Sequence, residues 1–221
     1  MKLIVTGASG ALGSATASLL ERDGHEVVRI VRTVPEGASP YIVGCSDLAD
    51  APACITAIAL AAERLGGLDG VLHLAGAFVW QPVVETDAQL WRSMFRANLE
   101  TALSVVQAAL KHLAPDGAIV TVGAAAAMPS GAGMGAYAAS KSAVARLTES
   151  LAAELGSGGI RINTLLPSII DTPDNRAAMP DADPAAWTHP DAIAEVAAFL
   201  VSPAARAIHG ALIPVTNAAS C

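Results

Sequence analysis

The sequence predicts an α/β fold in which one parallel β-sheet is covered by helices on both faces. Short apolar runs rich in β-branched residues alternate along the chain with longer helical patterns, and this alternation is typical of parallel strands joined by right-handed crossovers. A glycine-rich turn joins the first apolar run to the first helical stretch. The composition, 53% hydrophobic and 15% charged, excludes a disordered chain. We expect a single domain over residues 1–221.

Each apolar run is bounded by Gly, Pro or Asp, as strands usually are. The expected strands are Lys2–Thr6, Glu26–Val31, Tyr41–Val43, Gly70–Leu74, Ala118–Val122, Ile160–Leu165 and Leu212–Val215. The expected helices are Ala11–Asp23, Ala51–Leu65, Asp87–Leu113, Gly135–Leu155 and Pro190–Leu200, with Asp87 and Pro190 at helix starts. The stretch from Arg32 to Pro40 is too short for a crossover helix, so a turn or extended segment is expected there.

Composition also limits the classes of partner and compartment. A formal charge of −7 disfavours nucleic-acid binding. Cys45, Cys54 and Cys221 form neither a metal-ligand spacing nor a disulfide framework, so we expect no metal site and reduced thiols in a cytoplasmic protein. The first strand begins almost at Met1 and leaves no room for a signal peptide. The longest uncharged stretch contains Pro129 and several glycines, which indicates a strand and loop and not a membrane span.

The glycine-rich turn has the form of a dinucleotide-binding loop. Gly7 permits a tight turn, Gly13 lets the helix pack closely on the strand, and the helix N-terminus offers N–H groups to a pyrophosphate. The residues expected to touch the cofactor here are Gly7, Ser9, Gly10, Ala11, Leu12 and Gly13.

Arg32 favours NADP(H) over NAD(H). No carboxylate stands at the end of the second strand, where it would bind the ribose hydroxyls of NAD, and Arg32 follows directly. A guanidinium at this place binds a 2′-phosphate through charge-assisted hydrogen bonds. The alternative is that Arg32 is a solvated surface charge. Asp47 and Leu48, just beyond the third strand, are expected to flank the adenine.

Tyr137 and Lys141 lie four residues apart and so share one face of a helix. A lysine ammonium beside a phenol stabilises the phenolate, and we therefore expect Lys141 to lower the pKa of Tyr137. Tyr137 can then exchange a proton with a carbonyl oxygen as hydride is transferred.

With these motifs in order, the whole chain resembles the short-chain dehydrogenase/reductase family. Further matches are His73-Leu-Ala-Gly76, Asn98 in Ala97-Asn-Leu, Gly159-Ile-Arg-Ile-Asn163 and Pro167. The alternation of strands and helices predicts a Rossmann-type, doubly wound sheet of order 3-2-1-4-5-6-7, and the resemblance implies Tyr137, Lys141 and Asn98 as catalytic residues. It also implies that the cofactor touches Tyr137 and Lys141 and the residues Ala75, Gly76, Pro167, Ile170 and Thr172.

Three positions depart from the family pattern. Ala11 replaces the middle glycine of the loop, Ser168 replaces a glycine after Pro167, and Ala124 stands where the family has its catalytic serine. Without that serine, a carbonyl substrate lacks one hydrogen-bond donor, unless Ser130 or a water molecule replaces it.

The absent serine favours a particular subgroup. The segment Asp171–Thr188, Ala124 before Tyr137, and Gly133-Met134 resemble dihydropteridine reductase, whose conjugated imine substrate needs less carbonyl polarisation. The leading expectation is therefore reduction of a quinonoid, pteridine-like substrate. The alternatives are an ordinary ketone or alcohol substrate, and a dinucleotide-binding sensor without chemistry.

A lid over residues 168–188 is expected to cover the site, because ligands bind beyond the carboxyl ends of parallel strands. Phe78, Val79 and Trp80, with Met179 and Trp187 of the lid, either stack on a flat substrate ring or cover a hydrophobic seam. Helices near Leu99–Leu113 and Val144–Leu155 are apolar on more than one side, which predicts a homo-oligomer, a dimer or a tetramer.

Overall fold

The computed structural model describes residues 1–217, and its strands form one parallel sheet of seven in the order β3-β2-β1-β4-β5-β6-β7. This confirms the predicted topology; Cys221 lies outside the described residues. The strands are β1 (Lys2–Thr6), β2 (Glu26–Val31), β3 (Ile42–Gly44), β4 (Leu68–His73), β5 (Leu113–Val122), β6 (Arg161–Pro167) and β7 (Leu212–Val215). The strand order reverses between β1 and β4, and open sheets of this kind bind ligands in the crevice beyond the carboxyl ends of the strands at such a point.

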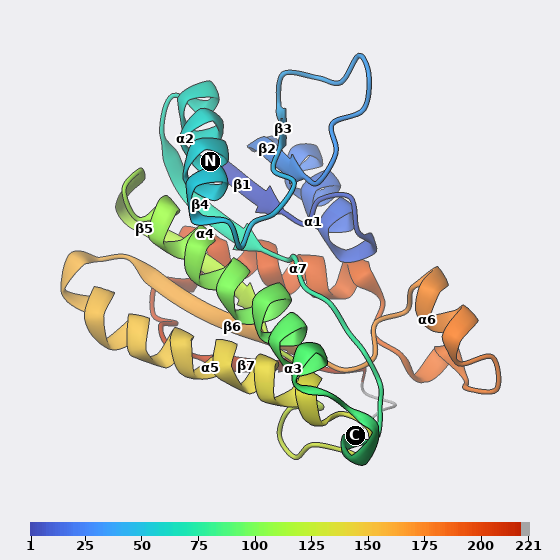
Figure 1. Ribbon diagram of the computed structural model, residues 1–221. Coiled ribbons are helices and arrows are strands. Elements are labelled where there is room, and N and C mark those ends of the chain that lie inside the picture. The colour runs from blue at the N-terminus through green and yellow to red at the C-terminus, as the bar shows by residue number, and fades with distance from the viewer. Residues whose placement is uncertain (218–221) are drawn as a thin grey trace.

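Helices cover both faces of the sheet (Figure 1). One face is covered by α1 (Ala11–Arg22) and α7 (Pro190–Val201), whose Leu20 and Leu200 are buried with Leu3 and Val5 of β1. The other face is covered by α2 (Ala51–Leu65), α4 (Thr101–Ala109) and α5 (Gly135–Leu155). The core is almost wholly aliphatic, as expected for a sheet enclosed between two helical layers.

The predicted helix from Asp87 to Leu113 is shorter than expected and contains a π-helical turn. Asp87 caps α3 (Ala88–Phe95) as expected, since its carboxylate accepts a 2.8 Å hydrogen bond from the Leu90 N–H. The chain then makes a π-helical turn, η2 (Arg96–Glu100), before α4. The helix ends at Ala109, and β5 already begins at Leu113. Such π-turns are frequent at functional sites, and this one carries Asn98.

Short connections complete the fold. No helix lies between β2 and β3, which confirms the prediction for Arg32–Pro40. The short helix α6 (Pro173–Ala178) lies in the lid, and single 3₁₀ turns are η1 (Val83–Glu85), η3 (Gly156–Gly158), η4 (Pro184–Ala186) and η5 (Pro203–Ala205). Within residues 1–217, no helix has the length and apolar character needed to cross a bilayer.

The buried guanidinium of Arg161 connects β6 to the end of α7. It donates hydrogen bonds to four backbone carbonyls, those of Leu200, Val201, Ser202 and Ala205. The last carbonyls of a helix have no partner within the helix, and a cation there also interacts favourably with the helix dipole. Arg161 therefore holds the C-terminal end of α7 against the start of β6.

Candidate active site

The loop after β1 packs against the loop after β4. Gly7 has φ +68°, a left-handed conformation that glycine adopts without strain. A Cβ at Gly7 would lie 2.7 Å from the backbone nitrogen of Ala75, and one at Gly13 would collide with the Gly7 carbonyl. These two positions are therefore restricted to glycine by close backbone approach, as the sequence predicted.

The N-terminus of α1 fits a pyrophosphate. Its cap residue is Gly10, and no side chain accepts hydrogen bonds from the first N–H groups of the helix. Ser9, Gly10 and Ala11 are exposed there, so these N–H groups are open to a ligand. A helix N-terminus with free N–H groups and a positive dipole end binds anions. The geometry of this end of the sheet fits a dinucleotide with its phosphates on α1.

Arg32, Asp47 and Leu48 lie at the carboxyl ends of β2 and β3, where the adenosine half of a dinucleotide is expected. Arg32 is exposed directly after β2, and Leu48 is buried. The Asp47 carboxylate pairs with Arg96 of η2 at 2.6 Å. Hydrogen bonds from Arg96 and the Ala49 N–H, with a smaller contribution from Arg32, lower the pKa of Asp47. The ion pair with Arg96 was not predicted from the sequence.

Asn98 is held from two sides. Its Oδ1 accepts a hydrogen bond from the Ala77 N–H at 2.9 Å, and its Nδ2 donates to the Ala77 carbonyl at 3.0 Å. Nδ2 also donates to Ser140 Oγ at 2.9 Å, and Ser140 Oγ donates to the Tyr137 carbonyl at 2.7 Å. The amide of Asn98 thus links the π-turn, the loop after β4 and the first turn of α5. Asn98 lies in the π-turn and is buried among these groups.

Lys141 reaches the same place from α5. Its Nζ donates to the Val122 carbonyl at 2.9 Å, and the side chain is buried. A Cβ at Gly76 would lie 2.8 Å from Asn98 Oδ1 and 3.0 Å from Lys141 Nζ, so both polar ends meet at Gly76. Burial lowers the pKa of Lys141 to about 8. The structure therefore brings Gly76, Asn98, Tyr137 and Lys141 together as predicted.

The predicted pKa of Tyr137 is wrong in direction. Burial raises the pKa of this phenol to about 12. At neutral pH Tyr137 is consequently a neutral phenol with a proton to donate. The ring of Phe78 packs against it in an edge-to-face arrangement, with centroids 4.9 Å apart and planes at 85°.

The loop after β5 offers no substitute hydroxyl in a fixed position. Ala124 is buried, 4% exposed. Ser130 is exposed, and its Oγ donates a long 3.4 Å hydrogen bond to the adjacent Gly131 carbonyl. The hydroxyl of Ser130 thus points toward the backbone of the next residue, Gly131.

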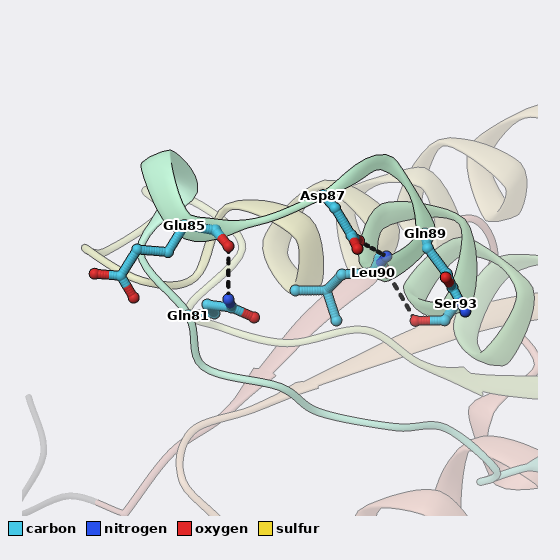
Figure 2. Close-up of a pocket in the computed structure, with 6 residues that line it drawn as sticks. All are labelled: Gln81, Glu85, Asp87, Gln89, Leu90 and Ser93. Carbon is cyan, nitrogen blue, oxygen red and sulfur yellow. Dashed lines mark hydrogen bonds between the residues drawn. The ribbon is translucent and has the colours of Figure 1, made fainter.

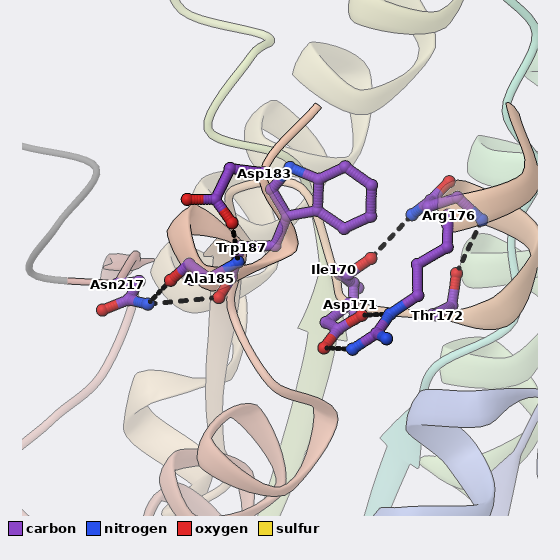
Figure 3. Close-up of polar contacts among 9 residues, drawn as sticks. Ile170, Asp171, Thr172, Arg176, Asp183, Ala185, Trp187 and Asn217 are labelled. Carbon is purple, nitrogen blue, oxygen red and sulfur yellow. Dashed lines mark hydrogen bonds and ion pairs between the residues drawn. The ribbon is translucent and has the colours of Figure 1, made fainter. Parts of the chain in front are cut away.

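The lid is closed at its base. Ser168 Oγ and Thr188 Oγ1 are 2.7 Å apart, and the Asp171 N–H donates to the Thr188 carbonyl at 2.9 Å. Figure 3 shows the bidentate ion pair of Arg176 with Asp171 and the contacts of Asn217 with the backbone of Ala185 and Trp187. Trp187 is buried, so it anchors the lid and does not face a ligand.

Three further residues predicted to touch the cofactor, Pro167, Ile170 and Thr172, lie at or just after the carboxyl end of β6. Pro167 is the last residue of that strand, and Ile170 bridges to Thr188. Thr172 caps α6 by accepting a 3.1 Å hydrogen bond from the Asn175 N–H. This end of β6 is two strands away from β4 and its Gly76 loop.

An open pocket of about 440 Å³ lies next to this cluster but outside it. Its lining is polar and acidic, and consists of Gln81, Glu85, Asp87, Gln89, Leu90 and Ser93. Figure 2 shows Gln81 Nε2 donating to the Glu85 carbonyl and Asp87 accepting from the Leu90 N–H. Among residues 1–217, no group of three or more His, Cys, Asp or Glu side chains could hold a metal ion.

The doubly wound sheet, the uncapped glycine loop and the Tyr137–Lys141–Asn98 cluster beside it define an oxidoreductase that binds a nicotinamide dinucleotide. The comparison with known proteins then gives the family. Residues 7–217 match the family profile described as "Enoyl-(Acyl carrier protein) reductase". The chain belongs to the short-chain dehydrogenase/reductase family.

Named relatives cover nearly the whole chain. It is 33% identical over 234 residues to cis-4-hydroxycyclohexanecarboxylate dehydrogenase of Sinomonas cyclohexanicum, covering 96% of this chain and 93% of the relative. It is 29% identical over 242 residues to meso-2,3-butanediol dehydrogenase of Serratia marcescens, covering 99% and 94%. A short-chain dehydrogenase from Burkholderia cenocepacia, solved in complex with NADP, has a TM-score of 0.87 at 29% identity, covering 100% and 98%.

These findings make the chain an enzyme, so the alternative of a sensor without chemistry is set aside. The particular resemblance to dihydropteridine reductase is not shown, because the similar proteins are other dehydrogenases.

Sequence reasoning missed two polar contacts of the site. Ser140 stands inside the Tyr137–Lys141 motif, and its place one residue before the lysine is the signal that could have found it. Arg96 pairs with a residue 49 positions away, and no local pattern indicates such a contact.

Proposed function

We propose that the protein interconverts a ketone and a secondary alcohol with NADP(H). The observation that carries the proposal is Tyr137, a neutral phenol held beside Lys141 and Asn98 at the crevice where the glycine loop opens. In the reduction, hydride from the bound dihydronicotinamide adds to the carbonyl carbon while the C=O π bond breaks and the oxygen takes a proton. The reverse direction returns the hydride and the proton.

The residues of this chain have distinct roles in that reaction. Tyr137 donates the proton from its hydroxyl to the substrate oxygen. Lys141, when protonated, stabilises the phenolate left on Tyr137. It then returns a proton to the phenolate oxygen. Asn98 and Ser140 hold the first turn of α5 against the loop after β4, and so fix the phenol in place. The N–H groups of α1 bind the pyrophosphate, and Gly76, Pro167, Ile170 and Thr172 bind the nicotinamide half.

The proposed preference for NADP(H) rests on Arg32. It is exposed at the end of β2 and close enough to Asp47 to affect that carboxylate, so a 2′-phosphate there would meet a guanidinium. NADPH should bind more tightly than NADH, and Arg32→Ala should remove roughly 1–3 kcal/mol of that preference, as for a charged hydrogen bond. A fluorescence titration measures both affinities. Equal affinities in the wild type would exclude Arg32 from the site.

One observation favours a second candidate, reduction of a quinonoid dihydropteridine. Ala124 leaves no hydroxyl beside the substrate oxygen, and the Ser130 hydroxyl donates to the Gly131 carbonyl. A conjugated imine needs a hydride and a proton but less polarisation than a ketone does.

Steady-state turnover of NADPH with a ketone panel and with a quinonoid dihydropterin separates the two candidates. Turnover of ketones but not of the dihydropterin supports the first candidate. Turnover of the dihydropterin alone supports the second. If neither is turned over, the proposed function is wrong.

We also propose that the protein is a homo-oligomer. Leu103 of α4 is 36% exposed, although most of that helix is apolar and buried. Light scattering at micromolar concentration should give the mass of a dimer or tetramer, and a monomer would refute this.

A further inference from the structure

The segment Ala77–Gln81 connects three parts of the candidate active site. Ala77 exchanges two hydrogen bonds with Asn98 of the π-turn. Phe78 packs edge-to-face on Tyr137, with 4.9 Å between ring centroids. The Gln81 N–H donates to the Gly133 carbonyl at 2.8 Å, in the loop that leads into α5. A single five-residue segment therefore contacts the groups on both sides of the phenol.

Trp80 connects this segment to the loop before α5, and we call its contact with Ala132 and Gly133 the clamp. Its Nε1 donates to the Ala132 carbonyl at 3.0 Å. The indole lies directly on Gly133, so that a Cβ at Gly133 would overlap its Cε2 and Nε1 atoms. Gly133 also has φ +73°, which disfavours any other residue. The ring and the glycine thus fit each other, and the contact fixes the distance between the two loops.

Large apolar side chains are exposed on this segment and on two other loops at the carboxyl ends of the strands. Phe78 is 51% exposed and Trp80 is 59% exposed, although each also makes a specific contact. Met128 and Ile169 are exposed in the loops after β5 and β6. These two strands are parallel, so both loops lie at the carboxyl ends of the strands. Exposed apolar surface of this kind marks a binding site for an apolar ligand. Ala124 adds no polar group to it.

The neighbouring pocket indicates the charge of the ligand. It begins at Gln81, the residue after Trp80, and carries the carboxylates of Glu85 and Asp87 (Figure 2). No Lys or Arg lines it. An anionic substituent that extends past Trp80 would therefore meet carboxylates of the same sign, and an uncharged substrate is favoured.

We propose that Phe78 and Trp80 select an uncharged substrate that carries a bulky apolar group on its reacting carbon. Phe78 contacts this group next to Tyr137, and Trp80 is a positioning residue that acts through Gly133 and the segment Ala77–Gln81. This inference rests on the proposed ketone–alcohol activity, and the bond changes are those given above.

The test compares cyclohexanone with the open-chain ketone 2-butanone in the presence of NADPH. Phe78→Ala should raise KM for cyclohexanone about tenfold, as for the loss of one aromatic contact, and KM for 2-butanone less than about threefold. Trp80→Phe keeps a ring but removes the donor to Ala132. It should raise KM for cyclohexanone about threefold with kcat within about twofold, as for the loss of one neutral hydrogen bond.

Trp91→Phe is the matched control, because Trp91 Nε1 donates a comparable 2.9 Å hydrogen bond to Thr86 Oγ1 and not to the loop that carries Ala132 and Gly133. This variant should change neither KM. The NADPH dissociation constant and the melting temperature should stay the same in all three variants, which excludes a general loss of structure. Equal changes in KM for both ketones, or an equal change in Trp91→Phe, would overturn the proposal. So would tighter binding of 4-oxocyclohexanecarboxylate than of cyclohexanone.

A binding measurement keeps the inference separate from the proposed activity. If the wild type turns over neither ketone, the proposed function fails. Saturation-transfer NMR of cyclohexanol with the NADP⁺ complex then tests the apolar site alone. Binding of cyclohexanol that is stronger than binding of 2-butanol, and that is lost in Phe78→Ala, supports the site. Equal binding of the two alcohols, or no effect of Phe78→Ala, contradicts it.

Discussion

Replacing Lys141 by methionine should make the protein more stable at neutral pH while it abolishes activity. The ammonium is buried beside Gly76 and Asn98 with one hydrogen bond, to the Val122 carbonyl. Burial lowers the pKa of Lys141 from 10.5 to about 8. At about 1.4 kcal/mol per pKa unit, this difference corresponds to about 3 kcal/mol of destabilisation when the amine is charged.

The pH dependence has a definite sign. Below pH 8 the amine is protonated in both the folded and the unfolded state, so the full destabilisation is present. Between about pH 8 and 10.5 the unfolded state binds the proton and the folded state does not, and stability therefore rises with pH. The methionine variant has no such dependence, but it loses a hydrogen bond worth about 1–2 kcal/mol.

Urea unfolding without cofactor, from pH 7 to pH 10.5, measures this effect. The free energy of unfolding of Lys141→Met minus that of the wild type should be positive, by about 1–2 kcal/mol, at pH 7 and should fall by about 3 kcal/mol by pH 10.5. Lys111→Met, at an exposed site, controls for the loss of a lysine. A difference that is constant over this range would show that Lys141 is not a buried cation, and would refute the reasoning.

Two further predictions concern the loops of the site. Gly13→Ala should lower the free energy of unfolding by at least about 2 kcal/mol and weaken NADPH binding, because its Cβ would meet the Gly7 carbonyl. Gly10→Ala should change stability by less than about 1 kcal/mol, since its Cβ would lie 3.4 Å from the same carbonyl; urea unfolding compares the two, and equal losses would contradict the packing argument. Ala124→Ser should raise kcat/KM on activated ketones roughly tenfold, because one well-placed donor contributes up to about 2.7–4 kcal/mol. Steady-state kinetics measures this, and loss of wild-type ketone turnover in Ser130→Ala would instead mean that Ser130 supplies the hydroxyl.

The topology was predictable from the sequence because it depends on local patterns. Alternating strands and helices imply parallel strands joined by crossovers. The glycine loop identifies β1 as a central strand whose carboxyl end faces the dinucleotide site. Gly7 and Gly13 were predictable for the same reason, since each is required by the backbone of its own turn.

What the sequence did not predict depends on contacts between distant residues. The π-turn at Asn98 is accompanied by hydrogen bonds to Ala77, 21 residues earlier. Strand β5 begins at Leu113 because it pairs there with Leu68, although the Pro115-Asp116-Gly117 stretch has the composition of a turn. The pKa of Tyr137 depends on how deeply its hydroxyl is buried. The four-residue spacing between Tyr137 and Lys141 contains no information on burial. In each case a tertiary contact overrides the local pattern.

The central claim is that Tyr137 transfers the proton in a dinucleotide-dependent reaction at this site. Tyr137→Phe removes one oxygen and keeps the ring that packs on Phe78. The measurement is single-turnover reduction of a reactive ketone by the NADPH complex of each protein. We predict that the rate falls by roughly 10²–10⁴-fold, the usual contribution of a general acid, while NADPH affinity changes less than about twofold. A variant that reduces the ketone as fast as the wild type would contradict the account.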